Sequence, residues 1–334
     1  MRITPNIIYS QLNRSIDQTN ETLGRLTEML ATNKKFLAPS EDVTAATRAL
    51  DYKVSISSND QYQQNIDHAQ NRLKFTDAVL TTTSKMLSDI KDLANISEGA
   101  VDPATLTILS QQVYQYRDQL ASVANSRYLG QYLFSGFRTD LQPYAAGTFV
   151  YQGDTGVMNV LISQANTLPV NLTGDSTFSY TLAAPTVKQL GGGQYVHYTP
   201  GAGTTVNVEI RDTTDTAVLD TFSFSNVIQM TDVLGAAIGT GNALRVQALS
   251  DPFGQVGDQM RNAQAEVGSR LNRLQDQTDW ITSSTNTLKD ALSSVEDANI
   301  NEIAISLQKT NVALQALYAA SSKIMQQSLF NFLT

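Results

Sequence analysis

The chain has 334 residues and no cysteine, and its 23 basic residues against 31 acidic ones give a net charge of −8. Disulfides, thiolate metal sites and cysteine nucleophiles are therefore excluded. The acidic balance argues against nucleic acid and anionic membranes as partners, because both are bound by clustered Lys and Arg. No apolar run approaches the ~20 residues of a membrane span. Residues 1–5 lack the apolar core of a cleavable signal.

The first forty residues carry the heptad pattern of a coiled-coil helix. Thr4 is placed to cap this helix and Pro5 to open it, because a first-turn proline lacks only an N–H that has no helical partner. We expect the helix to end near Lys35. Its apolar-type positions step by four and three residues, at Leu12, Ile16, Thr19, Leu23, Leu26 and Leu30.

Two further helices are predicted between residues 40 and 130. One begins at Ser40, with acidic residues in its first turn, and ends at Gly99. The other is capped by Asp102 and closes at Gly130. The first helix carries the heptad positions Ile66, Ala69, Leu73, Thr76, Leu80, Thr83, Leu87, Ile90 and Ala94. The second carries Leu106, Leu109, Val113, Tyr116, Leu120 and Val123.

The segment 141–245 has a different texture, which predicts an inserted β domain. Thr and Gly are frequent, and residues 206–211 alternate apolar and polar side chains as a half-buried strand does. Glycine-rich turn signals separate the candidate strands. Besides 206–211, these candidates are 149–151, 157–162, 177–182 and 219–224.

Helix is predicted to resume at Asp251 and Pro252 and to break at residues 297–299. Asn299 and Glu302 then have the spacing of a capping box for a last helix. This helix carries a second heptad series, at Ile303, Leu307, Thr310, Leu314, Leu317, Ser321 and Ile324.

The two terminal helices are predicted to pair, because both are ~50 Å long and both carry heptad positions. We therefore expect a mainly α fold with an inserted β domain, forming an elongated rod of long antiparallel helices. The predicted domains are a terminal coiled coil (1–38 plus 297–334), a helical rod (39–140 plus 246–296) and the outer β domain (141–245).

Residues with catalytic or ligand-binding chemistry are sparse. The two histidines, His68 and His197, have no partner at metal-ligand spacing. The glycines at 191–193 lack the strand, helix and Lys context of a phosphate loop. The sequence therefore predicts no enzyme, no cofactor, no metal site and no small-molecule substrate.

The terminal helices carry the candidate functional surface instead. Apolar residues such as Ile7, Ile8 and Met29 lie off the heptad positions, so one partner helix cannot cover all of them. Neighbouring copies in a ring or helical assembly could cover the rest. The predicted assembly residues are Leu12, Ile16, Leu23, Leu26, Leu30, Ile303, Leu307, Leu314, Leu317 and Ile324.

The sequence resembles the flagellin-like axial proteins of bacterial flagella over nearly its whole length. At the N-terminus the resemblance rests on residues 1–9, 23–30, 39–50 and 61–66. Three further blocks indicate the members that join hook to filament rather than flagellin itself. They are Tyr132-Leu133-Phe134-Ser135-Gly136-Phe137, residues 149–156 and the C-terminal block 319–333.

The resemblance implies an extracellular structural adaptor, which leaves through the flagellar type III export channel and keeps its N-terminus. It implies assembly distal to hook-associated protein 1, a ring of copies that receives flagellin, and an export chaperone bound to residues 299–334. The chaperone-binding residues would be Leu314, Leu317, Ile324, Leu329 and Phe332. Two alternatives stay open: a short flagellin that forms the filament itself, and adhesion by the β domain.

Overall fold

The computed structural model describes residues 5–99 and 101–333, and the side chains of 7–99 and 101–324. Its contacts define two compact units, Met1–Gln61 with Trp280–Thr334, and Tyr62–Asp279. The helices are α1 (Pro5–Thr32), α2 (Val43–Ser97), α3 (Pro103–Ala124), α4 (Gly174–Phe178), α5 (Val227–Gly239), α6 (Ala243–Glu296) and α7 (Ile300–Leu333). The strands are β1 (Arg127–Tyr128), β2 (Gln131–Tyr132), β3 (Asn159–Ser163), β4 (Asn166–Pro169), β5 (Thr186–Gln189), β6 (Tyr195–Pro200), β7 (Val206–Arg211) and β8 (Val218–Phe224).

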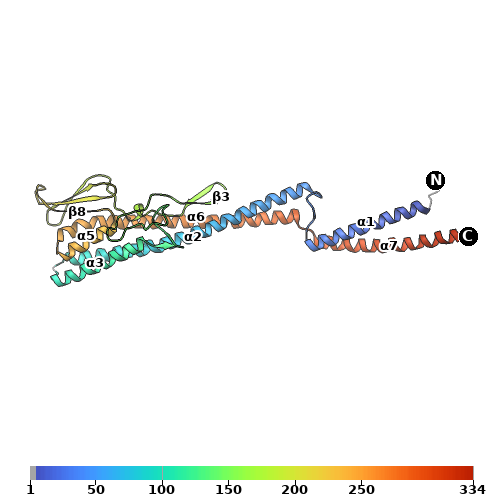
Figure 1. Cartoon of the computed structure of the whole chain (residues 1–334), viewed down its shortest axis with the longest axis horizontal. Coiled ribbons are helices and arrows are strands. Elements are labelled where there is room, and N and C mark those ends of the chain that lie inside the picture. The colour runs from blue at the N-terminus through green and yellow to red at the C-terminus, as the bar shows by residue number, and fades with distance from the viewer. Residues whose placement is uncertain (1–4, 100, 334) are drawn as a thin grey trace. The chain divides into compact units, whose positions relative to one another are not determined.

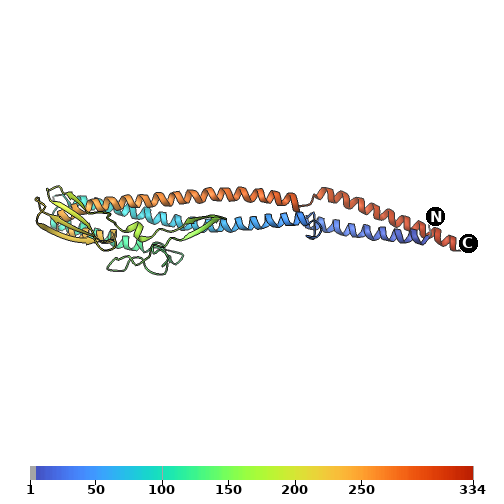
Figure 2. The same cartoon turned by 90° about the horizontal axis from the view of Figure 1, so that it is seen from above.

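The fold class predicted from the sequence is confirmed: long helices dominate, a β region is inserted, and α1 packs against α7. Figures 1 and 2 both show α1 and α7 running side by side in opposite directions. Among the described residues, every helix is too short or too polar to cross a membrane. The predicted cap Thr4 lies outside the described residues.

The loop between α1 and α2 differs from the prediction at both ends. Helix α1 ends at Thr32 because Asn33 takes a left-handed φ of 56°, which Asn tolerates better than most residues. Helix α2 begins at Val43, and Asp42 is its cap: the carboxylate accepts the Ala45 N–H at 2.8 Å.

The heptad positions predicted for α2 form the core of the second unit. Ile66, Leu73, Leu80 and Ile90 are completely buried. Helix α3 is capped by Asp102 as predicted, but it ends at Ala124. A tight antiparallel hairpin of β1 and β2 follows, and Gly130 makes its turn with a φ of 83°.

Two of the blocks that carry the family resemblance, residues 132–137 and 149–156, meet in one loop cluster of the second unit. The Asp154 carboxylate accepts the backbone N–H groups of Phe137 and Gly156, each at 2.8 Å. These amides hold the pKa of Asp154 below its usual range. Gly136 has a φ of 71°, and a Cβ there would lie 2.0 Å from Asp154 Oδ1. Tyr151 donates its hydroxyl to the carbonyls of Phe134 and Asp154. These two blocks therefore stabilise the conformation of this loop cluster.

Three of the predicted strands are present. Residues 206–211 form β7, residues 218–224 form β8, and residues 159–163 form β3. Strands β5 to β8 make an antiparallel sheet in sequence order. The prediction of strands at 149–151 and 177–182 is wrong. Residues 149–151 contribute only the isolated bridge of Tyr151. Thr173 caps the single-turn helix α4, which takes up the start of 177–182.

The return to helix is earlier than predicted. Asn226 caps α5, and α6 already begins at Ala243, so Pro252 lies inside α6. A proline there removes the N–H that would bond to the carbonyl of Ala248. The Tyr198 hydroxyl donates to that carbonyl at 2.5 Å. The buried carbonyl of Ala248 therefore has a hydrogen-bond donor despite the proline.

The chain passes from the helices to the four-stranded sheet and back through a narrow neck. Ser179 and Asn226 form an isolated antiparallel bridge, and the Tyr180 N–H donates to the Ser225 carbonyl at 3.3 Å. The chain therefore enters and leaves the sheet at adjacent points. Arg245 of α6 binds Asp220 of β8 at 2.6 Å and attaches the sheet to the helix.

Candidate assembly interface

The predicted heptad residues of α1 and α7 lie on the faces that pack together. We call these two rows the seam. Ile303 is buried, whereas Leu30 remains 40% exposed. The half-buried positions are Leu12, Ile16, Leu23, Leu26, Leu307, Leu314, Leu317 and Ile324. The side chains of Leu329 and Phe332 lie outside the described residues. The structure thus brings the described seam residues together but covers most of them only in part.

Polar residues interrupt the seam. Thr19 and Thr310 each return their hydroxyl to a carbonyl one turn earlier in their own helix, at 2.6 and 2.8 Å. Beside them is a shallow hollow of about 390 Å³ that is open to solvent and lined by Ser15, Gln18, Thr19, Thr22, Lys309, Thr310 and Ala313. Because threonines stand at positions where a continuous coiled coil has large apolar side chains, the pairing of α1 with α7 buries less apolar surface than such a coiled coil.

Large apolar side chains also face solvent on the outer sides of the terminal helices. In α1, Ile7 is 53% exposed and Ile8 is 42% exposed. In α7, Ile305 is 56% exposed and Val312 is 59% exposed. An exposed apolar row of this kind is typical of a surface that binds another chain.

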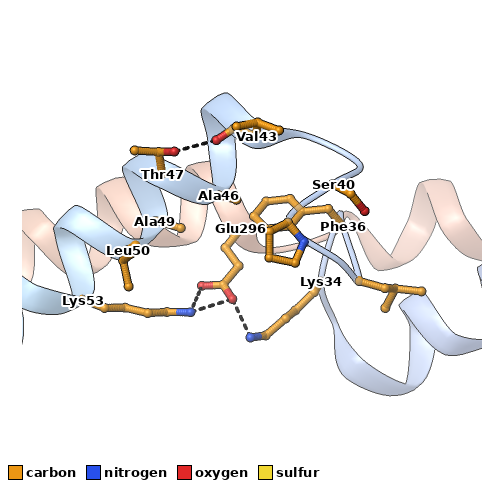
Figure 3. A pocket seen from close by; sticks show the side chains of 12 residues that line it. Lys34, Phe36, Ser40, Val43, Ala46, Thr47, Ala49, Leu50, Lys53 and Glu296 are labelled. Atoms are coloured by element: carbon orange, nitrogen blue, oxygen red, sulfur yellow. Dashed lines mark hydrogen bonds and ion pairs between the residues drawn. The ribbon is translucent and has the colours of Figure 1, made fainter.

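The loop between α1 and α2 is fixed to the end of α6 by an ion-pair cluster around Glu296 (Figure 3). The Glu296 side chain is only 7% exposed and binds the ammonium groups of Lys34 and Lys53, at 2.5 and 2.8 Å. Backbone bonds add to this attachment: Lys35 donates to the Glu296 carbonyl at 2.8 Å, and Ala298 donates to the Asn33 carbonyl at 3.0 Å. Burial alone would raise the pKa of Glu296, but the two ammonium groups outweigh it and lower the pKa.

Replacing Glu296 by Gln is expected to loosen this attachment, because two lysines lose the carboxylate that they share. A charged hydrogen bond contributes about 1.5–3 kcal/mol, so the amides of Lys35 and Ala298 should exchange with solvent at least tenfold faster. Since the folded-state pKa is lowered, the wild-type attachment persists above the usual glutamate pKa and weakens as pH falls through the lower folded value. Hydrogen exchange measured against pH tests both effects.

Lys289, which forms none of the described ion pairs, offers the matched control on the same helix. Lys289→Gln should leave exchange at Lys35 and Ala298 unchanged. Equal protection factors in Glu296→Gln and the wild type would contradict the role given to Glu296. So would a wild-type protection factor, corrected for the intrinsic pH dependence of amide exchange, that does not fall with pH.

The described part of the chain holds no cluster of side chains suited to a metal ion. No group of three or more His, Asp or Glu side chains there is arranged for a metal ion. His68 is exposed on α2, and His197 of β6 pairs with Asp215 at 2.6 Å. Glycines 191–193 form the turn between β5 and β6, where the Gly193 N–H donates to the Leu190 carbonyl.

The sequence analysis did not predict the apolar surface at the start of α2. Next to the Glu296 cluster lies a mostly apolar pocket of about 540 Å³ (Figure 3). Its lining residues are Lys34, Phe36, Leu37, Pro39, Ser40, Val43, Ala46, Thr47, Ala49, Leu50, Lys53 and Glu296. Val43 and Leu50 are 67% and 61% exposed, and they begin a four-three heptad series that could have been found from spacing alone.

The terminal regions match two protein-family models. The bacterial flagellin N-terminal helical region matches residues 3–139, and the bacterial flagellin C-terminal helical region matches residues 253–333. Together these matches cover well over half of the chain and include α1 and α7. The chain belongs to the bacterial flagellin family.

Within that family, its curated relatives are flagellar hook-associated proteins 3. The Salmonella typhimurium protein is 23% identical over 332 residues, which is 99% of both chains. The Escherichia coli protein is 23% identical over 180 residues, covering 53% of this chain and 57% of its own.

Solved structures show the same fold. FlgL of Xanthomonas campestris superposes with a TM-score of 0.56 at 20% identity, over 72% of this chain and 99% of its own. The flagellar junction protein FlgL of Legionella pneumophila gives a TM-score of 0.53 at 14% identity, over 76% of this chain and 100% of its own. The relatives are structural proteins of the flagellum, and this chain is a flagellar component.

Proposed function

We propose that the chain is the structural adaptor that joins the hook of a bacterial flagellum to its filament. The observation that carries the proposal is the end-to-end match to a flagellar hook-associated protein 3, over 99% of both chains. The seam of α1 and α7 is the part that would perform the task, since its half-covered residues require further chains for burial.

The adaptor acts by folding and packing, and we infer no catalytic role. A seam that threonines interrupt is marginal as an isolated pair of helices. Neighbouring subunits supply the missing apolar contacts, so the terminal helices gain stability on assembly. A joint of this kind transmits force through many small contacts and needs no cofactor, metal or small-molecule substrate.

Four partners follow from this role. The chain assembles with copies of itself in a ring, on hook-associated protein 1, and receives flagellin at its distal side. Before export through the flagellar type III system, a chaperone covers the apolar rows of α7. We assign this contact to Leu314, Leu317, Ile324, Leu329 and Phe332. The chain reaches the cell exterior without a cleaved signal peptide.

Deletion of the gene in its source bacterium tests the proposal. Cells should carry hooks without filaments, and flagellin should accumulate in the medium because it has nothing to polymerise on. Bare hooks without filament protein in the medium would identify the chain as a short flagellin instead. Normal filaments would overturn the adaptor role and direct attention to adhesion by the sheet β5 to β8.

A further inference from the structure

We propose that the start of α2 in one subunit packs against the outer face of α7 in a second copy of the chain. The proposal rests on the adaptor function and names the contact through which copies join. Two exposed apolar rows of the first unit (Met1–Gln61 with Trp280–Thr334) are the evidence for this contact. The α2 row comprises Val43, Thr47, Leu50 and Val54. The α7 row comprises Ile305, Val312, Ala316 and Ala319.

The α2 row is spaced four, three and four residues apart, as the contact positions of a coiled coil are. Val43, Leu50 and Val54 are 67%, 61% and 58% exposed. Thr47 donates its hydroxyl to the Val43 carbonyl at 2.8 Å, so its methyl group is left for apolar contact (Figure 3). The row is therefore a surface suited to binding a helix, and no other described part of the first unit covers its exposed side chains.

The α7 row lies on the side of the helix opposite the seam. With Lys309 between Ile305 and Val312, the row steps by four, three, four and three residues, as coiled-coil positions do, and its apolar members flank one lysine. The seam residues Ile303, Leu307 and Leu314 fall on the other side of the helix. Ile305 and Val312 are 56% and 59% exposed. Because α1 occupies the seam, the outer row needs a different helix.

The two rows fit each other in length, shape and charge. At 1.5 Å per residue, the α2 row is about 17 Å long and the α7 row about 21 Å. Leu50 can enter the hole that Ile305 and Val312 form with the residues between them, as knobs enter holes in a coiled coil. Asp51 then adjoins Lys309, and both are exposed and outside the described ion pairs.

The contact is head-to-tail, because the two surfaces belong to different elements. Each subunit offers one row of each kind, so the same contact can repeat from copy to copy and build a ring or a short helical stack. The pocket of about 540 Å³ beside Val43 and Leu50 leaves room for side chains of the incoming α7. A second copy is thus the occupant that the surface fits.

Cysteine cross-linking tests the contact, and the natural chain contributes no background because it has no cysteine. Leu50→Cys with Val312→Cys is introduced into the full chain in its source bacterium, and isolated flagella are oxidised briefly. We expect disulfide-linked dimers of the chain. The matched control is Arg48→Cys with Val312→Cys, since Arg48 is exposed on the same helix but lies away from the row. It should give several-fold less dimer.

The outcomes separate the contact from the adaptor function. If the Leu50/Val312 variant is present in flagella but stays monomeric, or cross-links no better than the control, the contact is wrong while the function stands. Cross-linking of Leu50→Cys/Val312→Cys to flagellin or another component, to the same extent as to a second copy of the chain, would also overturn the proposed contact. If neither the wild type nor the variants occur in flagella, the adaptor function fails and the contact fails with it.

Discussion

Cells that carry Leu314→Asp are expected to lose swimming motility and to release flagellin into the medium. Leu314 is half-buried in the seam, opposite α1. The substitution removes apolar burial and places a carboxylate in a partly apolar contact. Together these effects cost about 3 kcal/mol, or roughly a hundredfold in the equilibrium constant for seam formation. Leu317→Asp should behave in the same way.

The matched control is Gln315→Asp, which adds the same charge at an exposed position of α7 one residue away. Cells that carry Gln315→Asp should swim normally. Circular dichroism of purified Leu314→Asp should keep the helical signal of the second unit, since none of its core residues is changed. Normal motility in Leu314→Asp, or loss of most of the helical signal, would contradict the assignment of Leu314 to assembly.

Replacing Gly136 by Ala is expected to destabilise the second unit by more than 3 kcal/mol. The residue has a φ of 71°, which costs a non-glycine residue about 1–2 kcal/mol. Its new Cβ would also lie 2.0 Å from Asp154 Oδ1 and 2.4 Å from the Asp154 carbonyl oxygen. Both oxygens already accept hydrogen bonds, so Asp154 cannot withdraw without breaking them.

Gly130→Ala separates the two contributions. Gly130 has a φ of 83°, but a Cβ there would meet no atom within 4 Å. It should therefore cost only the conformational strain. At about 2–4 °C per kcal/mol for a unit of this size, thermal unfolding should fall by about 10 °C in Gly136→Ala and about 3 °C in Gly130→Ala. Equal shifts would show that the contact with Asp154 contributes nothing.

Local periodicity predicted the long helices and the pairing of α1 with α7. The buried positions Ile66, Leu73 and Leu80 follow a strict heptad, and a heptad needs no knowledge of distant residues. Helix α5 was missed although Asn226 caps it and its buried residues recur at helical spacing, on the side that faces α3 and the sheet. Its β-branched residues Val227, Ile228 and Val233 also suit a strand, and the neighbouring segments favoured that interpretation.

Features that depend on residues far apart in the chain could not be predicted. The start of α6 was placed at Pro252, and only the structure shows that the hydroxyl of Tyr198 replaces the missing backbone donor. The Glu296 cluster likewise joins Lys34, Lys53 and Glu296 from three separate elements. Their charges are ordinary in the sequence, and no local pattern brings them together.

The neck at Ser179 and Asn226 makes the four-stranded sheet an exchangeable module. Because the chain leaves and re-enters the helical part at adjacent points, a sheet of another size could be grafted there, provided that it also covers α5 and replaces the hydrogen bond from Tyr198 to Ala248 of α6. The sheet can accumulate substitutions or be replaced while the terminal helices keep their sequence. For protein engineering, the neck offers a site at which a foreign domain with neighbouring termini could be displayed on the flagellum.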